Sequence, residues 1–430
     1  MPTDRHIPQH LPQHSATQSR RFATRVALVY GAVFGLGGVS LPFFPVWLRA
    51  VGVDVGWIGL ITAVPSLTRF TVLPFATGFA ERHNVLRGAI IVLAFLTALG
   101  FVAVGRFDSA LPILLLYALT ACVWTPIVPL VDGYALKGVT QYALDYGPLR
   151  LWGSAAFMAG ALGCGALIAV IAETQLIWVM VAMALFGAVA SIGLQPLAAH
   201  AAPGATQVPA PHLLRQPAFL AIIFTSALVQ GSHAAYYAFS SIAWQGAGLS
   251  GFTISVLWSL GVIAEIIVFA ISPRFTWSAS TLVAVGAASA VLRWVLTAQQ
   301  PAIPLLAMVQ TMHGLTYGIT QVGTVGLLLR NVPTRVMARA QGYLVAASGI
   351  VASCATVASG GLYAGYGEGV YYAMSAMGLV GLALVLLMRR RLENTGAGTS
   401  EAGSTGVDTT EAVIGTEADG AHPHSDGAGG

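Results

Sequence analysis

Charge is scarce in this chain of 430 residues, since Asp, Glu, Lys and Arg together make up 8% of it while apolar residues make up 56%. That balance excludes an ordinary soluble domain, in which about a quarter of the residues are charged. Cysteine is scarce as well, with three in the whole chain and no spacing typical of a disulfide framework or a metal motif. We therefore expect a membrane protein that holds no structural disulfide, no metal ion and no cofactor.

Motifs of catalysis are also lacking. The sequence has no P-loop, no HExxH and no GxSxG in a strand–turn–helix setting. An ATP-driven pump needs a nucleotide-binding domain, and the longest polar segment is a short tail. We conclude that the protein is not an enzyme and that any energy it uses comes from a gradient.

Long apolar runs are what the chain does have. Spanning a bilayer takes about 20 mainly apolar residues. The runs are continuous, whereas β-barrel strands alternate in short segments, so we predict helices. The expected fold is an all-α membrane protein with twelve transmembrane helices in two six-helix halves. The predicted segments are 24–48, 56–79, 86–105, 110–136, 148–172, 175–195, 218–245, 251–272, 277–298, 302–329, 339–365 and 369–389.

Two polar tails and one linker divide the sequence. A stretch rich in Pro, Ala and His separates six segments from six, and the C-terminal stretch is too polar to fold alone. We predict a disordered tail over 1–23, a first half over 24–195, a linker over 196–217, a second half over 218–389 and a disordered tail over 390–430.

Basic residues indicate the orientation. With the N-terminus placed in the cytoplasm, only Arg49 and Arg106 fall in outer loops, which agrees with the positive-inside rule. Both termini and the linker are then cytoplasmic, and the protein is a multi-pass protein of the inner membrane. The net charge of +4 is explained by this topology, so we expect the lipid bilayer and no nucleic acid as a partner.

Three ionisable residues interrupt successive apolar segments, namely Glu265, Arg293 and His313. A charge at bilayer depth costs roughly 2.5–3.5 kcal/mol even on permissive scales, so such residues are usually paired and functional. We expect a Glu265–Arg293 ion pair, with which protonation of Glu265 or of a nearby histidine competes. The alternatives are an ion pair that only fixes packing and histidines that are neutral hydrogen-bonding groups.

A short pattern, Q-x2-H-x3-Y, occurs in both the seventh and the tenth segment. Spacings of three and four place its residues on one helix face. In a half built from inverted three-helix repeats the two faces would line the same cavity, although so short a match can also be coincidence. The residues are Gln230, His233 and Tyr237 in the seventh segment, and Gln310, His313 and Tyr317 in the tenth.

Other residues extend these polar faces. Trp258 is seven residues from Glu265 and so lies on the same side of its helix, and Trp294 follows Arg293. Arg69 lies within the second segment, where it could also extend towards an interface. In the first half, Asp132 and Arg150 are predicted to belong to a cytoplasmic charge cluster that latches one conformation and so acts as a gate.

Several stretches resemble those of a known family. They include Leu41-Pro42-Phe43-Phe44, Arg150-Leu151-Trp152-Gly153-Ser154, the run from Gln230 to Tyr237, Glu265, Arg293-Trp294 and His313. Together they resemble the major facilitator superfamily, and within it the phenylpropionate transporter branch that is related to the oligosaccharide and nucleoside proton symporters. The resemblance covers all twelve segments and neither tail.

The resemblance implies alternating access by a monomeric, proton-coupled symporter that imports a small organic solute, an aromatic carboxylate such as 3-phenylpropionate. For such a solute, Arg293 or Arg69 would attract the carboxylate. The ring would pack against aromatic side chains, namely Trp258, Tyr236, Tyr237 and Trp294. In the related sugar symporters a carboxylate follows the histidine of the tenth helix by one turn. Here that position is Thr316, which makes Glu265 the main candidate for the proton site. The alternatives are a nucleoside or sugar symporter, an uncoupled facilitator or effluxer, and a membrane solute sensor.

Overall fold

The computed structural model describes residues 16–197, 213–333 and 336–394. Within these ranges the chain is almost entirely helical and contains no strand. The first half consists of α1 (Ala16–Ala50), α2 (Val55–Thr71), α3 (Leu73–Arg82), α4 (Leu86–Val104), α5 (Ala110–Trp124), α6 (Ile127–Tyr142), α7 (Tyr146–Leu167), the short η1 (Glu173–Gln175) and α8 (Leu176–Ile192).

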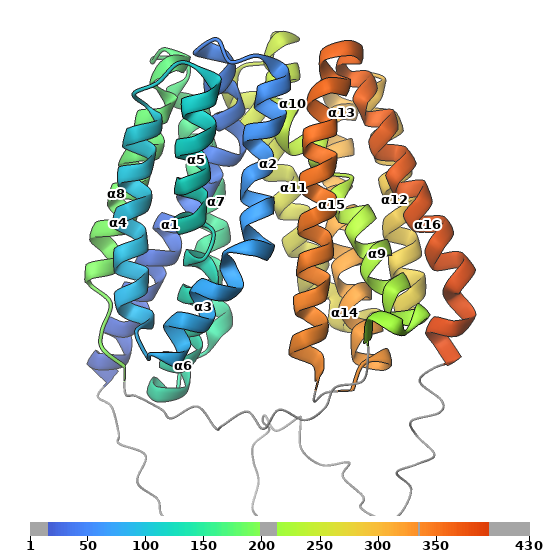
Figure 1. Ribbon diagram of the computed structural model, residues 1–430, viewed down its shortest axis with the longest axis horizontal. Helices are drawn as coiled ribbons and strands as arrows, with labels where there is room; N and C mark the ends of the chain where they lie inside the picture. The colour runs from blue at the N-terminus through green and yellow to red at the C-terminus, as the bar shows by residue number, and fades with distance from the viewer. Residues whose placement is uncertain (1–15, 198–212, 334–335, 395–430) are drawn as a thin grey trace, which may run out of the picture.

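The second half begins with the short η2 (Leu213–Arg215) and contains more broken helices than the first. Its elements are α9 (Pro217–Gly231), α10 (Ala234–Gly246), α11 (Gly251–Ile271), η3 (Ser272–Arg274), α12 (Ala279–Ala298), α13 (Ile303–Thr311), the π-helix η4 (Gly314–Ile319), α14 (Thr320–Asn331), α15 (Met337–Tyr366), η6 (Gly367–Gly369) and α16 (Val370–Asn394). Figure 1 shows α1–α8 on the left and α9–α16 on the right.

The predicted all-α membrane fold is confirmed. Among the described residues, eight helices are long and apolar enough to cross a membrane, or nine if the bent pair α2 and α3 counts as one span. One of the eight is the stretch Arg339–Glu393, which holds both α15 and α16. The helices follow the order of the predicted segments, but the total of twelve crossings stays a prediction.

The ends of the helical region differ from the predicted boundaries. Helix α1 begins at Ala16 and α16 continues to Asn394, so helix extends into both ranges that were predicted as tails. The rest of those tails, and most of the linker 196–217, lie outside the described residues.

Prolines mark two of the helix breaks. Helices α2 and α3 meet at an angle of 42°, with Pro74 in the first turn of α3, and Pro126 precedes the first residue of α6. Proline lacks the backbone N–H that would continue a helix, and it is favoured in a first turn. Pro42 and Pro45, in contrast, lie inside α1 without interrupting it.

The two halves pack closely at the upper end of Figure 1, which is the end opposite to the start of α1. Helix α2 packs along α15, and α7 packs along α11. A Cβ atom added to Gly59 would lie 2.8 Å from the Cα of Gly360, and one added to Gly165 would lie 2.4 Å from the carbonyl oxygen of Gly251. Backbones that approach this closely leave room only for glycine, as is typical of membrane helix contacts.

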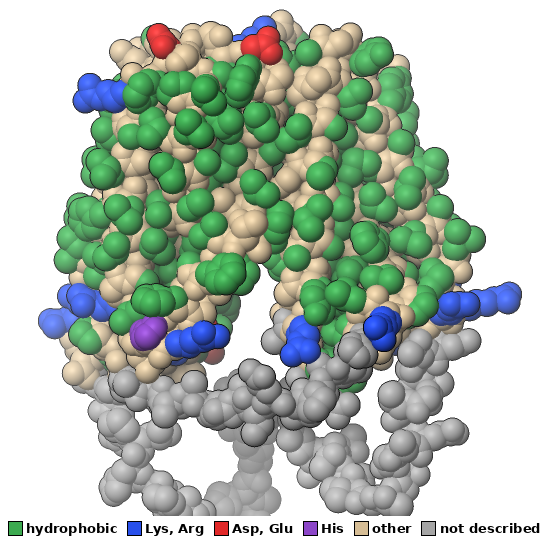
Figure 2. Space-filling model, in the orientation of Figure 1, with side chains coloured by type: hydrophobic (Ala, Val, Ile, Leu, Met, Phe, Trp, Pro, Cys, Tyr) green, Lys and Arg blue, Asp and Glu red, His purple; other side chains and the backbone are tan. Residues whose placement is uncertain are grey.

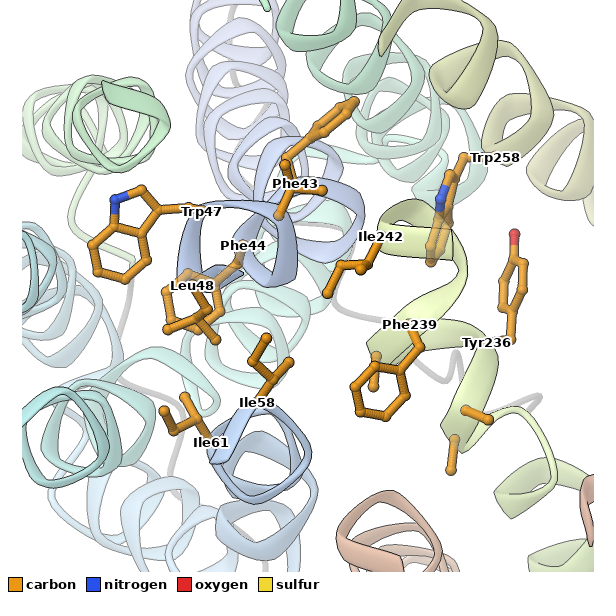
Figure 3. Packing of buried hydrophobic residues seen from close by; sticks show 14 of the residues in the cluster. Phe43, Phe44, Trp47, Leu48, Ile58, Ile61, Tyr236, Phe239, Ile242 and Trp258 are labelled. Carbon is orange, nitrogen blue, oxygen red and sulfur yellow. The ribbon is translucent and has the colours of Figure 1, made fainter. Parts of the chain in front are cut away.

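Apolar side chains and one polar contact complete this upper closure. Figure 3 shows the apolar side chains of α1 and α2 facing those of α10 and α11 across the two halves. The side-chain amide of Gln245 donates a hydrogen bond to the carboxylate of Glu173, which also joins the halves. At the lower end the space-filling view shows a hollow between the halves (Figure 2). The structure is therefore closed at its upper end and open at its lower end.

The glycine contact between α7 and α11 can be tested by substitution. Gly165→Ala would place a Cβ atom 1.7 Å from the hydroxyl oxygen of Ser255, and such overpacking typically costs about 1–3 kcal/mol. We expect a lower melting temperature for the purified protein in detergent.

Gly163 of the same helix provides a matched control, because a Cβ atom there would meet nothing within 4 Å. Alanine favours a helix by up to about 1 kcal/mol over glycine, so Gly163→Ala is expected to be neutral or slightly stabilising. Equal melting temperatures for the two variants would contradict the close contact.

Candidate functional site

Both copies of the Q-x2-H-x3-Y pattern lie where a helix loses its regularity. His233 occupies the junction between α9 and α10, and His313 immediately precedes the π-helix η4. Such irregular turns occur frequently at functional sites, because they turn side chains and backbone groups away from the regular helix pattern. The two segments share a local distortion as well as three residue types.

Glycines allow the second of these segments to press against α11. A Cβ atom on Gly314 would lie 2.6 Å from the carbonyl oxygen of Ala264, and one on Gly261 would lie 3.3 Å from the Cβ of His313. Since no larger residue fits, η4 and α11 lie in direct backbone contact. This contact places His313 beside Glu265 on the next turn of α11.

The centre of the site is the guanidinium group of Arg293 on α12, which is 0% exposed. Its Nη1 donates to Nδ1 of His313 and to the hydroxyl of Thr316, both at 3.1 Å, and its Nη2 donates to the side-chain oxygen of Gln310 at 3.2 Å. The guanidinium carbon also lies 4.9 Å from the ring centre of Tyr236. All of these partners are uncharged.

The expected Glu265–Arg293 ion pair is wrong for this structure. Among the described residues no carboxylate lies within ion-pair distance of Arg293, because the imidazole of His313 stands between the two side chains. Oε2 of Glu265 lies 3.5 Å from Nε2 of His313. Arg293 therefore keeps a buried charge without a counter-charge in contact, and its Nε has no hydrogen-bond partner in the described part of the chain.

The hydrogen bonds of His233 determine which of its nitrogens carries the proton. Nδ1 faces the carbonyl oxygens of Val229 and Gln230 at 3.2 and 3.1 Å. A carbonyl oxygen only accepts, so Nδ1 must donate. Nε2 lies 3.0 Å from the hydroxyl of Thr316. That hydroxyl accepts from Arg293, and it can donate its own hydrogen to Nε2. Neutral His233 satisfies every one of these contacts.

His313 has the opposite arrangement. Its Nδ1 receives a hydrogen bond from Arg293, so this nitrogen must be the acceptor, and the ring hydrogen lies on Nε2, which faces Glu265. His313 cannot carry a second proton while its contact with Arg293 persists. The neutral interpretation of the two histidines therefore fits this conformation.

Glu265 connects the buried cluster to the surroundings, since 25% of its side chain is exposed. Arg150 on α7, in the other half of the protein, acts electrostatically on Glu265. Arg69 on α2 is exposed, and Tyr317 of η4 lies within the range of its charge. The two arginines of the first half thus lie near the polar residues of the second.

The predicted aromatic residues do come together. The ring centres of Tyr236 and Trp258 are 4.6 Å apart, and both side chains appear at one end of the cluster in Figure 3. Trp294 lies against His233, with ring centres 5.0 Å apart. Tyr236, Trp258 and Trp294 are buried, whereas Tyr237 is partly exposed. Tyr237 is therefore better placed than the other three to contact a solute in this conformation.

The two copies of the pattern also make equivalent internal stacks. The rings of His233 and Tyr237 lie 5.8 Å apart, and those of His313 and Tyr317 lie 5.3 Å apart, both nearly parallel. The two histidine rings meet edge to face at 5.3 Å. The glutamines differ: Gln310 accepts from Arg293, while the amide atoms of Gln230 are buried with no partner among the described residues.

The predicted gate residues lie together in the first half. Asp132 on α6 accepts hydrogen bonds from the hydroxyls of Tyr30 and Tyr146 at 2.6 and 2.9 Å, and Nε of Arg150 lies 3.9 Å away. The guanidinium of Arg150 also covers the ring of Phe34 at 4.0 Å. All these residues belong to the first half, so in this conformation the cluster does not tie the two halves together.

Two parts of this geometry were not anticipated. From the sequence, Thr316 was notable only for replacing a carboxylate. In the structure its hydroxyl hydrogen-bonds both His233 and Arg293. Tyr30 and Tyr146 gave no signal, because single tyrosines in apolar segments are common. Among the described residues, no group of three His, Cys, Asp or Glu side chains is arranged to hold a metal ion.

Comparison with known proteins shows similarity over most of the chain. The family described as "MFS_1 like family" matches residues 23–376. The probable 3-phenylpropionic acid transporter of Escherichia coli K12 is 33% identical over 366 residues, which cover 84% of this chain and 96% of that protein. The maltose permease of Geobacillus stearothermophilus is 26% identical, over 86% of this chain and 95% of that protein.

Solved structures show similarity of fold. The crystal structure of the nucleoside transporter NupG matches with a TM-score of 0.73, covering 86% of this chain and 99% of that one, at 14% sequence identity. At that identity the match supports the helical architecture alone.

The role of Thr316 as the hub of the buried cluster can be tested by Thr316→Val. The substitution keeps the shape of the side chain but leaves Nε2 of His233 without its donor and takes one acceptor from Arg293. A buried polar group without a partner costs about 1–3 kcal/mol, so we expect a lower melting temperature.

Thr316→Ser, which restores the hydroxyl, should recover most of that loss. Thr311→Val is the control, because Thr311 is exposed and its hydroxyl bonds only the carbonyl of Met308. A Thr316→Val protein as stable as the Thr311→Val protein would show that the hydroxyl has no structural role.

Proposed function

This chain belongs to the MFS_1 like family of major facilitator transporters, and we propose that it is a proton-coupled symporter that imports a small aromatic carboxylate such as 3-phenylpropionate. The Escherichia coli relative, a probable 3-phenylpropionic acid transporter, supports this substrate class, as that protein is 33% identical along nearly its whole length. The site geometry supports it independently.

The observation that carries the proposal is the charge of Arg293. A buried guanidinium normally has a carboxylate partner, because an unpaired buried charge is costly. Here it is held by three neutral acceptors, and its Nε is left without a partner among the described residues. A solute that carries a carboxylate would supply the missing negative charge. Maltose and nucleosides carry none, so this arrangement favours an anionic solute.

Aromatic side chains around Arg293 suit the remainder of such a solute. Tyr236, Tyr237 and Trp258 pack against one another within 6.0 Å between ring centres. Aromatic rings prefer offset or edge-to-face contacts with other rings. We propose that a phenyl group binds against this cluster and that Gln230, Gln310 and Tyr317 line the same site. Arg69, at the lower hollow, would attract the anion on its way.

The proton site of this proposal is the pair formed by Glu265 and His313. Glu265 is the partly exposed member of the cluster and touches His313, which touches Arg293. A proton bound to this pair therefore alters the charge next to the bound carboxylate. Asp132 and Arg150 are proposed to act as a gate when the lower hollow closes, since Arg150 already acts electrostatically on Glu265.

Transport by alternating access accounts for the shape. The closed upper end and the open lower end correspond to one of the two states that such a carrier must visit (Figure 2). Basic side chains gather along the lower edge, which supports a cytoplasmic lower face by the positive-inside rule. We propose a monomer in the inner membrane with both termini in the cytoplasm, and with halves over 24–195 and 218–389.

Replacing Arg293 tests the carboxylate site. Removing one member of a buried, hydrogen-bonded charge pair costs about 2–5 kcal/mol in binding. We therefore expect Arg293→Gln to lose nearly all binding and uptake of radiolabelled 3-phenylpropionate in a panel of aromatic acids, nucleosides and sugars. The control is Arg106→Gln, since Arg106 lies in the loop between α4 and α5 of the first half, over the ring of Trp178. Unchanged uptake by Arg293→Gln, or uptake by the native protein of neutral solutes alone, contradicts the proposed substrate class.

Replacing Glu265 tests the coupling. Glu265→Gln removes the negative charge beside His313 but keeps the size of the side chain, so we expect proton-driven accumulation to stop while exchange or downhill flux of 3-phenylpropionate continues. The matched control is Glu81→Gln on α3, which is exposed. Full accumulation by Glu265→Gln would remove Glu265 from the mechanism. Equal uptake by the native protein with and without a proton gradient would instead identify an uncoupled facilitator.

A further inference from the structure

The two sites proposed above meet at one atom, Nδ1 of His313. In this structure Nδ1 accepts a hydrogen bond from Arg293 at 3.1 Å, so its lone pair is occupied and cannot bind a proton. The other ring nitrogen faces Glu265 at 3.5 Å and carries the ring hydrogen. Whether His313 can be protonated therefore depends on where the guanidinium of Arg293 points.

The hydrogen bonds between this cluster and Arg293 are weak for a charged donor. Its three hydrogen bonds measure 3.1, 3.1 and 3.2 Å, and all the acceptors are neutral. Hydrogen bonds between two charged groups are typically about 2.7–2.9 Å long and roughly twice as strong as neutral ones, and a carboxylate can bind a guanidinium with two of them. A carboxylate placed beside Arg293 would therefore outcompete His313 for its donors.

We propose that the incoming carboxylate draws Arg293 away from His313 and that the freed Nδ1 then takes up the proton that is transported with the solute. This inference rests on the proposed carboxylate site. It assigns the proton to a particular atom and makes Arg293 the element that links solute binding to proton binding. Arg293 has a second role here, because it keeps His313 neutral until the solute arrives.

The charges balance in this sequence of events. Before binding, the positive charge of Arg293 and the negative charge of ionised Glu265 offset each other across neutral His313. The bound carboxylate adds one negative charge, and one proton from the solvent, reaching Nδ1, adds one positive charge. No group other than His313 changes its protonation. The imidazolium formed lies between two anions, Glu265 and the solute, which stabilise it.

The groups around His313 agree with this assignment. The neighbours are His233 at the junction between α9 and α10, Tyr236 on α10, Tyr317 on η4, Glu265 on α11 and Arg293 on α12. Arg150 of α7 acts on Glu265 from further away.

His233 is the other histidine in contact, but Arg293 does not hydrogen-bond to it. Its Nδ1 donates to two carbonyl oxygens, and its Nε2 faces the hydroxyl of Thr316, which can donate or accept. Removing Arg293 therefore frees neither nitrogen of His233. The two histidines of the repeated pattern thus differ in one respect: the Arg293 guanidinium occupies the acceptor nitrogen of His313 only.

Isothermal titration calorimetry of the full chain with 3-phenylpropionate, in buffers of different ionisation enthalpy, counts the protons taken up on binding. We expect about one proton per ligand for the native protein, with an affinity that falls about tenfold per pH unit across the range in which free His313 is neutral and ligand-bound His313 is protonated. His313→Gln can accept from Arg293 and donate to Glu265, but it cannot bind a proton. This variant should bind with a proton uptake near zero and an affinity independent of pH.

His233→Gln, measured in parallel, should still take up about one proton. His83→Gln replaces a histidine at an exposed loop position and is the control for the effect of replacing any histidine. Proton uptake by His313→Gln, or its loss in His233→Gln alone, overturns the assignment. Binding by the native protein without any proton uptake overturns it as well, while leaving the carboxylate site intact. Failure to bind any carboxylate would instead overturn the proposed function.

A second measurement needs no ligand. Nitrogen NMR of labelled histidines reports the protonation of each ring, and the His313 signal is the one that disappears in His313→Gln. In the native protein we expect Nδ1 of His313 to stay unprotonated between about pH 5 and 8, the range in which an unrestrained histidine titrates. In Arg293→Met, which removes the donor, the same ring should take up a proton at a higher pH than it does in the native protein. Identical titration of His313 in the two proteins would overturn the role of Arg293 whatever the solute is.

Discussion

A buried guanidinium group without a counter-charge is the constraint on which the rest of this site depends. Arg293 is completely enclosed, and its donors are met by an imidazole, a hydroxyl and an amide instead of a carboxylate. Moving a charge into a low-dielectric interior is costly unless it is paired. The surroundings therefore have two tasks at once: to supply enough neutral acceptors for Arg293, and to remain loose enough for an anion to replace them.

Breaks in the helices place the neutral acceptors around Arg293. A regular helix would direct the residues of each Q-x2-H-x3-Y pattern along one stripe, whereas the junction at His233 and the π-helix after His313 turn both imidazoles toward Arg293 and Thr316. Gly261 and Gly314 allow η4 and α11 to touch, which brings Glu265 into contact with His313. The chain of contacts from Arg293 to Glu265 thus follows from backbone irregularity and small residues.

The two ends of the molecule differ, and this difference bears on the chain of contacts from Arg293 to Glu265. Glycine contacts and an apolar cluster close the upper end, and the hollow between the halves lies at the lower end. Glu265 is partly exposed and Arg69 is exposed. Asp132 and Arg150 are held by tyrosines within the first half, and Arg150 nevertheless acts on Glu265 in the second. A movement that closes the lower end would change this interaction and would close the path to the buried cluster.

The sequence by itself determined the class of fold and the identity of most site residues. Long apolar runs with little charge have few stable arrangements other than membrane helices, and ionisable residues inside them are rare enough to mark a site, as Glu265, Arg293 and His313 do. Only the tertiary structure decided the pairing within the site. Glu265 meets His313 instead of Arg293, and Thr316 joins His233 to Arg293, because these contacts depend on helix breaks and on ångström-scale approaches at glycine. The spacing of residues along a chain predicts which of them share a helix face, but it does not predict the distance between two helices.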